Sequence, residues 1–165
     1  MGQQQLLLLV LAIAIVGLAV VNVLQEFPHL RNKSEYDKLT MEAFELVADA
    51  QAWKQKPQAL GGGAGASYLT GLTLNQMGYP QTGSNAKASW ATTDDMWRWL
   101  ARPDTRRPYA QVRSRANTDL MVQVFMYGPG VSCIKSRLLR HNGTRWIGDG
   151  TNVATNAVPD GCDGW

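Results

Sequence analysis

The first 25 residues of this 165-residue chain lack any ionisable side chain, because all 16 Lys and Arg and all 13 Asp and Glu residues lie at or after Glu26. Soluble domains do not contain uncharged segments of this length, so the composition excludes a wholly soluble protein. The rest of the chain has ordinary shares of charged and aromatic residues, which are typical of one packed domain. The net charge of +3 is too small to imply a nucleic-acid partner by itself.

Residues that commonly carry out catalysis are also scarce. Only His29 and His141 could act as bases near neutral pH, and neither stands in a recognisable relation to a Ser, Cys or carboxylate. No phosphate-binding loop, dinucleotide fingerprint or metal-ligand spacing is present. Oxygen-bearing residues near the C-terminus match no calcium loop, and turn formation accounts for all of them: Asp149, Asn152, Asn156, Asp160 and Asp163. We therefore expect no enzymatic activity, no cofactor and no bound metal.

The uncharged segment contains an apolar run of membrane-spanning length. Between Leu6 and Leu24 only Gly17 and Asn22 are not Leu, Ile, Val or Ala, and about 20 such residues cross a bilayer as a helix. The alternative is a removed signal peptide, which has a basic residue before a shorter apolar run and a small-residue cleavage site after it. Neither feature is present here, so we expect residues 1–25 to form a transmembrane helix.

A second helix signal follows within a few residues. Ser34 is a good N-cap, and Asp37 three positions later completes an arrangement like a capping box. Apolar residues then recur at intervals of three and four, which predicts one buried stripe on an amphipathic helix. The stripe comprises Tyr36, Leu39, Ala43, Leu46, Val47, Ala50 and Trp53. With Pro28 as a kink or short break, the helix is predicted to continue over residues 26–57 and to end at Pro57.

Residues 58–165 are predicted to form a globular head. Residues 61–92 are rich in Gly, Ser, Thr and Asn, which indicates a long surface loop. Thr93 is expected to cap a short helix from Asp94 to Arg102. The apolar residues expected to pin the loop to the head are Leu69, Leu72, Leu74 and Met77.

From Tyr109 onward the hydrophobic period changes to two, and turn signals such as Asn142-Gly143 separate the runs. The predicted strands are 109–115, 120–127, 131–141 and 144–148. The residues of the second strand that should face the helix stripe are Leu120, Val122, Val124 and Met126. The predicted fold class is therefore α+β, with a long N-terminal helix, apolar in its first half and amphipathic in its second, packed on a four-stranded antiparallel sheet.

Cys133 and Cys162 are the only cysteines. An even pair in a segment anchored by a membrane span predicts an oxidised, extracytoplasmic disulfide. The alternative is two free thiols in a reducing compartment. A bond would tie the C-terminal tail to the third predicted strand and, for a loop of about 29 residues, would contribute roughly 3 to 4 kcal/mol in the chain-entropy model.

The order of these parts resembles a type IV pilin. Proteins of that family have an uncharged apolar helix that runs into an amphipathic one, a variable loop, a four-stranded antiparallel sheet and a disulfide-bounded C-terminal region. The corresponding parts of this chain are residues 1–25, 34–56 and 60–90, the strands from Tyr109, and Cys133 to Cys162. The chief departure is Gln5, because most pilins have a glutamate five residues into the mature chain.

This resemblance implies a structural subunit of an extracellular, cell-surface filament that serves adhesion, motility or DNA uptake. It also implies an inner-membrane location before assembly, a pilus assembly machinery, and a prepilin peptidase that cuts before Met1 or after Gly2. The partner in the filament would be further copies of the chain, packed through the apolar helix. The residues expected in that packing are Gln5, Leu6, Leu7, Leu11, Ile13, Val16, Gly17 and Val20.

Two other functions stay open from the sequence. The span could simply anchor a monomeric extracytoplasmic binding domain, or the chain could be a minor pseudopilin of a secretion system. An arginine-rich stretch interleaved with Trp97, Trp99 and Tyr109 could contact DNA or another anionic surface, although most such runs are solvated. Its arginines are Arg98, Arg102, Arg106, Arg107, Arg113 and Arg115.

Overall fold

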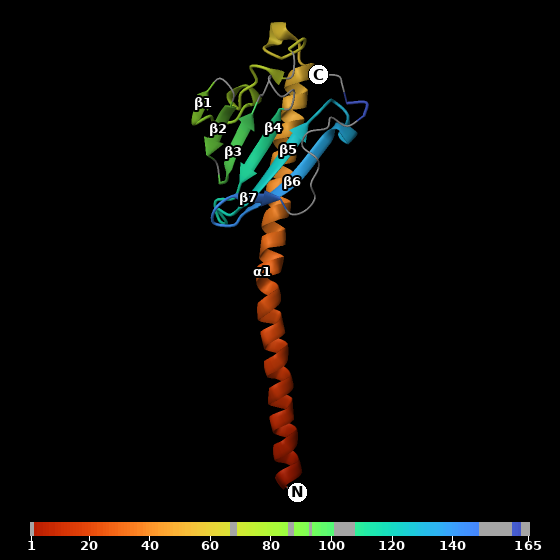
Figure 1. Cartoon of the computed structure of the whole chain (residues 1–165), viewed down its shortest axis with the longest axis vertical. Helices are drawn as coiled ribbons and strands as arrows, with labels where there is room; N and C mark the ends of the chain where they lie inside the picture. The colour runs from red at the N-terminus through yellow and green to blue at the C-terminus, as the bar shows by residue number, and fades with distance from the viewer. Residues whose placement is uncertain are drawn as a thin grey trace. The chain divides into compact units, whose positions relative to one another are not determined.

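The computed structural model describes residues 2–66, 69–85, 88–92, 94–100, 108–148 and 160–162. It has an α+β fold in which one long helix, α1 (Gly2–Gln55), precedes an antiparallel sheet of seven strands (Figure 1). The chain divides into two compact units, Met1–Glu35 and Tyr36–Trp165. In the described residues the first unit is helix alone, whereas the second contains the rest of α1, the sheet and a disulfide.

α1 is continuous across the region where the sequence predicts a kink and a new start. Both Pro28 and Ser34 lie inside the helix, so Ser34 is not an N-cap. A proline in a helix interior removes one backbone hydrogen bond and costs about 3 kcal/mol. Good helix formers such as Gln25, Glu26 and Leu30 surround it. Propagating the existing helix is less costly than nucleating a second one, which explains why the prediction of a helix start at Ser34 is wrong.

The seven strands lie in the sheet in chain order, so each strand pairs with its sequence neighbours (Figure 1). Their bounds are β1 Gly83–Asn85, β2 Ala88–Thr92, β3 Met96–Leu100, β4 Tyr109–Arg113, β5 Leu120–Met126, β6 Ile134–His141 and β7 Trp146–Gly148. Strands β4 to β7 correspond to the four predicted strands, with slightly shorter ends. Short 3-10 helices lie in the connections: η1 Gln58–Leu60, η3 Asn75–Met77 and η4 Val131–Cys133.

The prediction of a four-stranded sheet is wrong, because three further strands precede the predicted meander. β3 occupies part of the segment predicted as a helix over residues 94–102. Met96 and Arg98 are exposed, while Trp97 and Trp99 are buried, which is the two-residue alternation of a half-buried strand. Asp95, which resembles a first-turn helix acid in the sequence, instead binds partners far away in the chain.

β1 and β2 form a hairpin within the segment predicted as a surface loop. Gly83 of β1 pairs with Trp90 of β2, and the indole lies so close that a Cβ on Gly83 would stand 2.4 Å from its ring. A large aromatic ring covering a strand glycine supplies the apolar packing that the glycine itself lacks. The Trp90 ring therefore supplies the apolar packing that lets this Gly-rich and Ser-rich segment form a strand.

One hydrophobic core lies between the helix residues of the second unit and one face of the sheet. The predicted stripe is confirmed, because five of its members are at most 1% exposed: Leu39, Ala43, Leu46, Val47 and Ala50. The predicted inward face of β5 is confirmed as well, because Leu120, Val122, Val124 and Met126 belong to the same core. From the connecting segment Leu69, Leu72 and Leu74 are buried in it, and Met77 packs against it.

The glycine run after α1 wraps around Trp53, near the helix C-terminus. The Trp53 indole N–H donates a hydrogen bond to the Gly61 carbonyl (3.1 Å), and the Gly63 N–H donates to the Trp53 carbonyl (2.9 Å). A Cβ on Gly63 would lie 1.9 Å from the indole ring, whereas a Cβ on Gly61 would meet open space. The run therefore does more than end the helix, since it packs against the last side chain of the stripe.

We predict that Gly63→Ala destabilises the head, because the added methyl group must displace the Trp53 ring. Overpacking of this kind costs roughly 1 to 3 kcal/mol, measurable as a lower urea midpoint of the detergent-solubilised chain. Gly61→Asn is the matched control, because asparagine tolerates the left-handed conformation of Gly61 (φ 78°) and has space there. Equal losses in the two variants would contradict the close packing of Gly63.

Candidate functional site: an apolar helix and a disulfide-closed head

The apolar part of α1 exposes all its large side chains. Between Leu6 and Leu24 their exposed fractions run from 50% at Val21 to 69% at Leu7. Within the described residues α1 is the one helix long and apolar enough to cross a membrane. Because exposed apolar area is unfavourable by about 25 cal/mol per Å², this surface requires a cover of lipid or of protein.

The structure places all eight residues expected in filament packing on this uncovered surface. Their side chains point to every side of the helix, since successive residues of an α-helix are rotated by about 100°. Gln5 is exposed near the helix start, in a first turn that contains no acidic residue. Nothing lies within 4 Å of the position of a Cβ on Gly17, so a neighbouring helix can approach closely there.

A polar cluster joins α1 to the sheet within the second unit. Asp95, only 2% exposed, accepts hydrogen bonds from the Lys38 ammonium (2.8 Å) and from the Arg115 backbone N–H (2.7 Å). The Trp97 indole N–H donates to the Glu42 carboxylate (2.8 Å), and Lys38 Nζ lies 3.7 Å from the other oxygen of that carboxylate. Buried carboxylates are stable only when paired in this way, so the cluster holds α1 on β3 in one register.

Burial raises the pKa of the Glu42 carboxyl above its ordinary value of 4.5. The hydrogen bond from Trp97 and the charge of Lys38 oppose this shift of the pKa, Asp95 adds to it, and burial has the largest effect. The folded state therefore binds this proton more tightly than the unfolded chain does. Through this group, stability is fully present below pH 4.5 and is lost as the pH rises through the raised pKa.

Cys133 and Cys162 form a disulfide in the C-terminal part of the head, as the sequence predicts. The two Cα atoms are 5.5 Å apart and the cysteines are 29 residues apart in the chain. Both sulfur-bearing side chains are nearly fully buried, in a small cluster with Phe125 and Tyr127. The bond therefore attaches the described end of the chain to the segment between β5 and β6.

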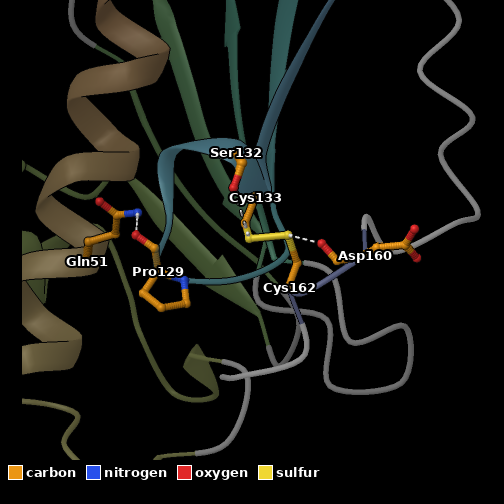
Figure 2. Close-up of a disulfide and its surroundings, with 6 residues drawn as sticks. All are labelled: Gln51, Pro129, Ser132, Cys133, Asp160 and Cys162. Carbon is orange, nitrogen blue, oxygen red and sulfur yellow. Dashed lines mark hydrogen bonds between the residues drawn. A yellow bond between two sulfur atoms is a disulfide. The ribbon is translucent and has the colours of Figure 1, made fainter.

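Figure 2 shows how that segment is held from two sides. On one side Gln51 of α1 donates a hydrogen bond to the Pro129 carbonyl (3.4 Å). On the other side Cys162 approaches so closely that a Cβ on Gly128 would lie 2.9 Å from its carbonyl oxygen. The Cys133 N–H also donates to the Gly130 carbonyl (2.9 Å). The segment Gly128-Pro129-Gly130 thus packs directly against the disulfide.

The predicted arginine stretch is only partly described. Arg98 lies exposed on β3 and Arg113 lies half-buried on β4, both on the sheet face that points away from α1. Arg115 is exposed in the turn after β4. Arg102, Arg106 and Arg107 lie outside the described residues. The sequence did not identify Lys135 and Arg137 of β6, which belong to the same face, because strand register rather than sequence proximity brings them together.

The remaining titratable candidates are not gathered into one place. Of the five oxygen-bearing residues weighed for calcium, only Asp160 is described, and Asp149, Asn152, Asn156 and Asp163 lie outside the described residues. Across the described ranges, no group of three or more His, Cys, Asp or Glu residues could hold a metal ion. His141 Nδ1 lies 4.0 Å from Asp119, beside the ring of Trp146.

Comparison of this chain with protein-family models, with curated proteins and with solved structures finds no match. The architecture itself, a long apolar N-terminal helix followed by an antiparallel sheet and a disulfide, is compatible with that of pilins. The physical properties of the helix and the head therefore carry the functional argument.

We expect Glu42→Gln to flatten the pH dependence of stability. The amide oxygen can still accept the Trp97 hydrogen bond, but the side chain no longer ionises, so the loss of stability above pH 4.5 that this group causes should disappear. Urea unfolding at several values between pH 4 and 7 measures the difference between the variant and the unmodified chain. Relative to that chain, the variant should gain stability with rising pH, and the exposed control Glu45→Gln should not. A relative loss would mean that the attraction of Lys38 outweighs burial.

The disulfide should stabilise the head without joining different copies. Cys162→Ser is expected to cost about 3 kcal/mol of unfolding free energy. The double variant with Cys133→Ser should cost nearly the same, because only one bond can be lost. Non-reducing electrophoresis should show monomer. A disulfide-linked ladder, or free thiols at both positions, would contradict an intramolecular bond.

Proposed function

We propose that this chain is the structural subunit of a type IV pilus-like extracellular filament that polymerises through its apolar N-terminal helix. One observation carries the proposal. The uncharged part of α1, residues 2–25, is at least half exposed at every large apolar side chain and precedes a head that already has its own closed core. The head needs no further partner to bury its core, whereas no described residue covers the apolar part of α1.

Assembly would exchange the lipid that surrounds the apolar part of α1 for helices of other copies. As a single span, the helix is surrounded by lipid, and in a filament the same surface packs against helices of other copies. No charge in residues 2–25 has to be dehydrated in the exchange. Gln5, which stands where pilins usually have a glutamate, would contact a neighbouring copy through hydrogen bonds, since it lacks the charge. Gly17 would allow close helix contact.

Contacts between copies would extend beyond the span. In the second unit the side of α1 away from the core includes Met41, which is 74% exposed, and Phe44, which is 40% exposed. A helix that faced only water would carry polar residues there. These two side chains support a second zone of packing between copies.

Two alternatives make different predictions about the state of the chain. A membrane-tethered monomeric binding domain would use residues 1–25 only as an anchor, and a minor pseudopilin would enter filaments built mostly from another subunit. Electron microscopy of material sheared from cells distinguishes them. Abundant thin filaments composed of this chain support the proposal, whereas membrane-bound monomer supports the tether. We propose no enzymatic activity for the chain.

Leu11→Arg should prevent assembly, because a charge in the helix core of a filament has no partner and costs several kcal/mol per subunit. Val16→Asp should have the same effect, and Leu11→Met is the matched apolar control. Filament yield in the sheared fraction is the measurement, with total chain quantified in the membrane fraction. Normal filament yield from both charged variants would exclude the helix as the polymer core.

A further inference from the structure

The strands of the head carry charge of one sign only. Across the seven described strands there is no Asp or Glu, while five residues are Lys or Arg: Arg98, Arg113, Lys135, Arg137 and Arg140. The acids of the described head lie on α1 and in the connections between strands. A basic sheet in a chain of net charge +3 is a local feature that overall composition does not reveal.

Strand register gathers four of these cations on one face. The sheet face that points away from α1, here called the outer face, includes Arg98, Arg113, Lys135 and Arg137. Arg98 pairs with Gln111, Gln111 with Gln123, and Gln123 with Arg137, so these side chains form one row across β3 to β6. With neighbouring strands about 4.8 Å apart, the row places Arg98 and Arg137 about 14 Å from each other.

Aromatic rings lie among these cations. Trp90 pairs with Arg98 at one end of the row, and the Arg113 guanidinium lies 5.3 Å from the centre of the Trp146 ring. The Arg137 guanidinium lies 5.1 Å from the centre of the Phe125 ring. Trp90 and Trp146 are half-buried and so keep part of their rings open. Flat aromatic rings next to guanidinium groups and amides are the side chains that contact unstacked bases and their phosphates.

Two of the four cations are held in place, and among the described residues none of the four has a carboxylate partner. Arg137 donates through Nε to Gln123 (2.8 Å) and Arg113 donates through Nε to the Thr118 carbonyl (2.9 Å), which fixes both guanidinium groups. In the described part of the chain, salt bridges join Lys38 to Glu42 and to Asp95, and His141 Nδ1 lies 4.0 Å from Asp119. None of these carboxylates is paired with an outer-face cation. Burial also lowers the pKa of Arg137, as expected for a cation without a facing acid.

We propose that the outer face of the sheet binds single-stranded nucleic acid, with phosphates on the arginines and bases stacked on Trp90 and Trp146. A bilayer surface fits less well, because the row between Arg98 and Arg137 is polar, with Gln111 half-buried and Gln123 buried, whereas a membrane-binding face would expose apolar side chains there. Repetition of this face along a polymer, which would multiply the affinity, rests on the proposed function. Binding by one copy does not.

The test uses the full chain as a detergent-solubilised monomer, so that it does not depend on filament assembly. Fluorescence anisotropy of labelled oligothymidylate should show binding whose log affinity falls with log salt at a slope of about −2 to −3, as four phosphate contacts imply. Arg98→Gln should weaken binding about threefold to tenfold and reduce the slope by about 0.7. Lys56→Gln, an exposed cation outside the strands, is the control and should change neither. Trp146→Leu should weaken binding about tenfold.

The competing occupants give different results. Equal loss in Arg98→Gln and Lys56→Gln, or no binding of oligothymidylate, would overturn the assignment. Competition by heparin as strong as that by unlabelled oligothymidylate, with no effect of Trp146→Leu, would indicate a general polyanion surface and would overturn it as well. Stronger competition by phosphatidylglycerol vesicles than by phosphatidylcholine vesicles would also overturn the assignment to nucleic acid. The Leu11→Arg chain should bind oligothymidylate normally, so failure of assembly and failure of binding can be told apart.

Discussion

The rest of the structure depends on one constraint, which is that every apolar surface of α1 must be covered by something. In the second unit the head supplies the cover, because one stripe of the helix packs against the inner face of the sheet and Lys38 is bound to Asp95 at its edge. Over residues 6–24 the helix is apolar on all sides, and the described residues supply no cover there. The same helix is therefore packed in one part and uncovered in the other, which is the physical basis of the proposal that it polymerises.

Local patterns were sufficient to predict the helix stripe, the inward face of β5 and the four later strands. A period of 3.6 or 2 is a property of neighbouring residues, and the disulfide followed from there being only two cysteines. The segment around β3 was misassigned because Thr93 and Asp94 look like a helix start. Asp95, though, is bound by Lys38, 57 positions away in sequence. No short window contains that contact.

The two candidate surfaces also differ in whether local sequence alone could predict them. The apolar helix could be identified from composition alone, because it requires no tertiary contact to define it. The basic face could not, since Arg98 and Arg137 lie in one row only through the pairing of four strands. The linear run of arginines pointed to the right region of the sheet but included Arg115, which lies in a turn, and omitted all of β6. The alternation of basic residues in β6, at Lys135 and Arg137, was the available signal.

Strand order equal to chain order has a consequence for how the head is made. If α1 enters the membrane first, each strand that follows emerges with its pairing partner already beside it, and no strand has to wait for a distant one. The sheet can therefore grow from β1 to β7 as the chain is synthesised. The disulfide comes last, because Cys162 follows all seven described strands. Oxidation would then stabilise a sheet that has already formed, so the disulfide would be made in a folded head.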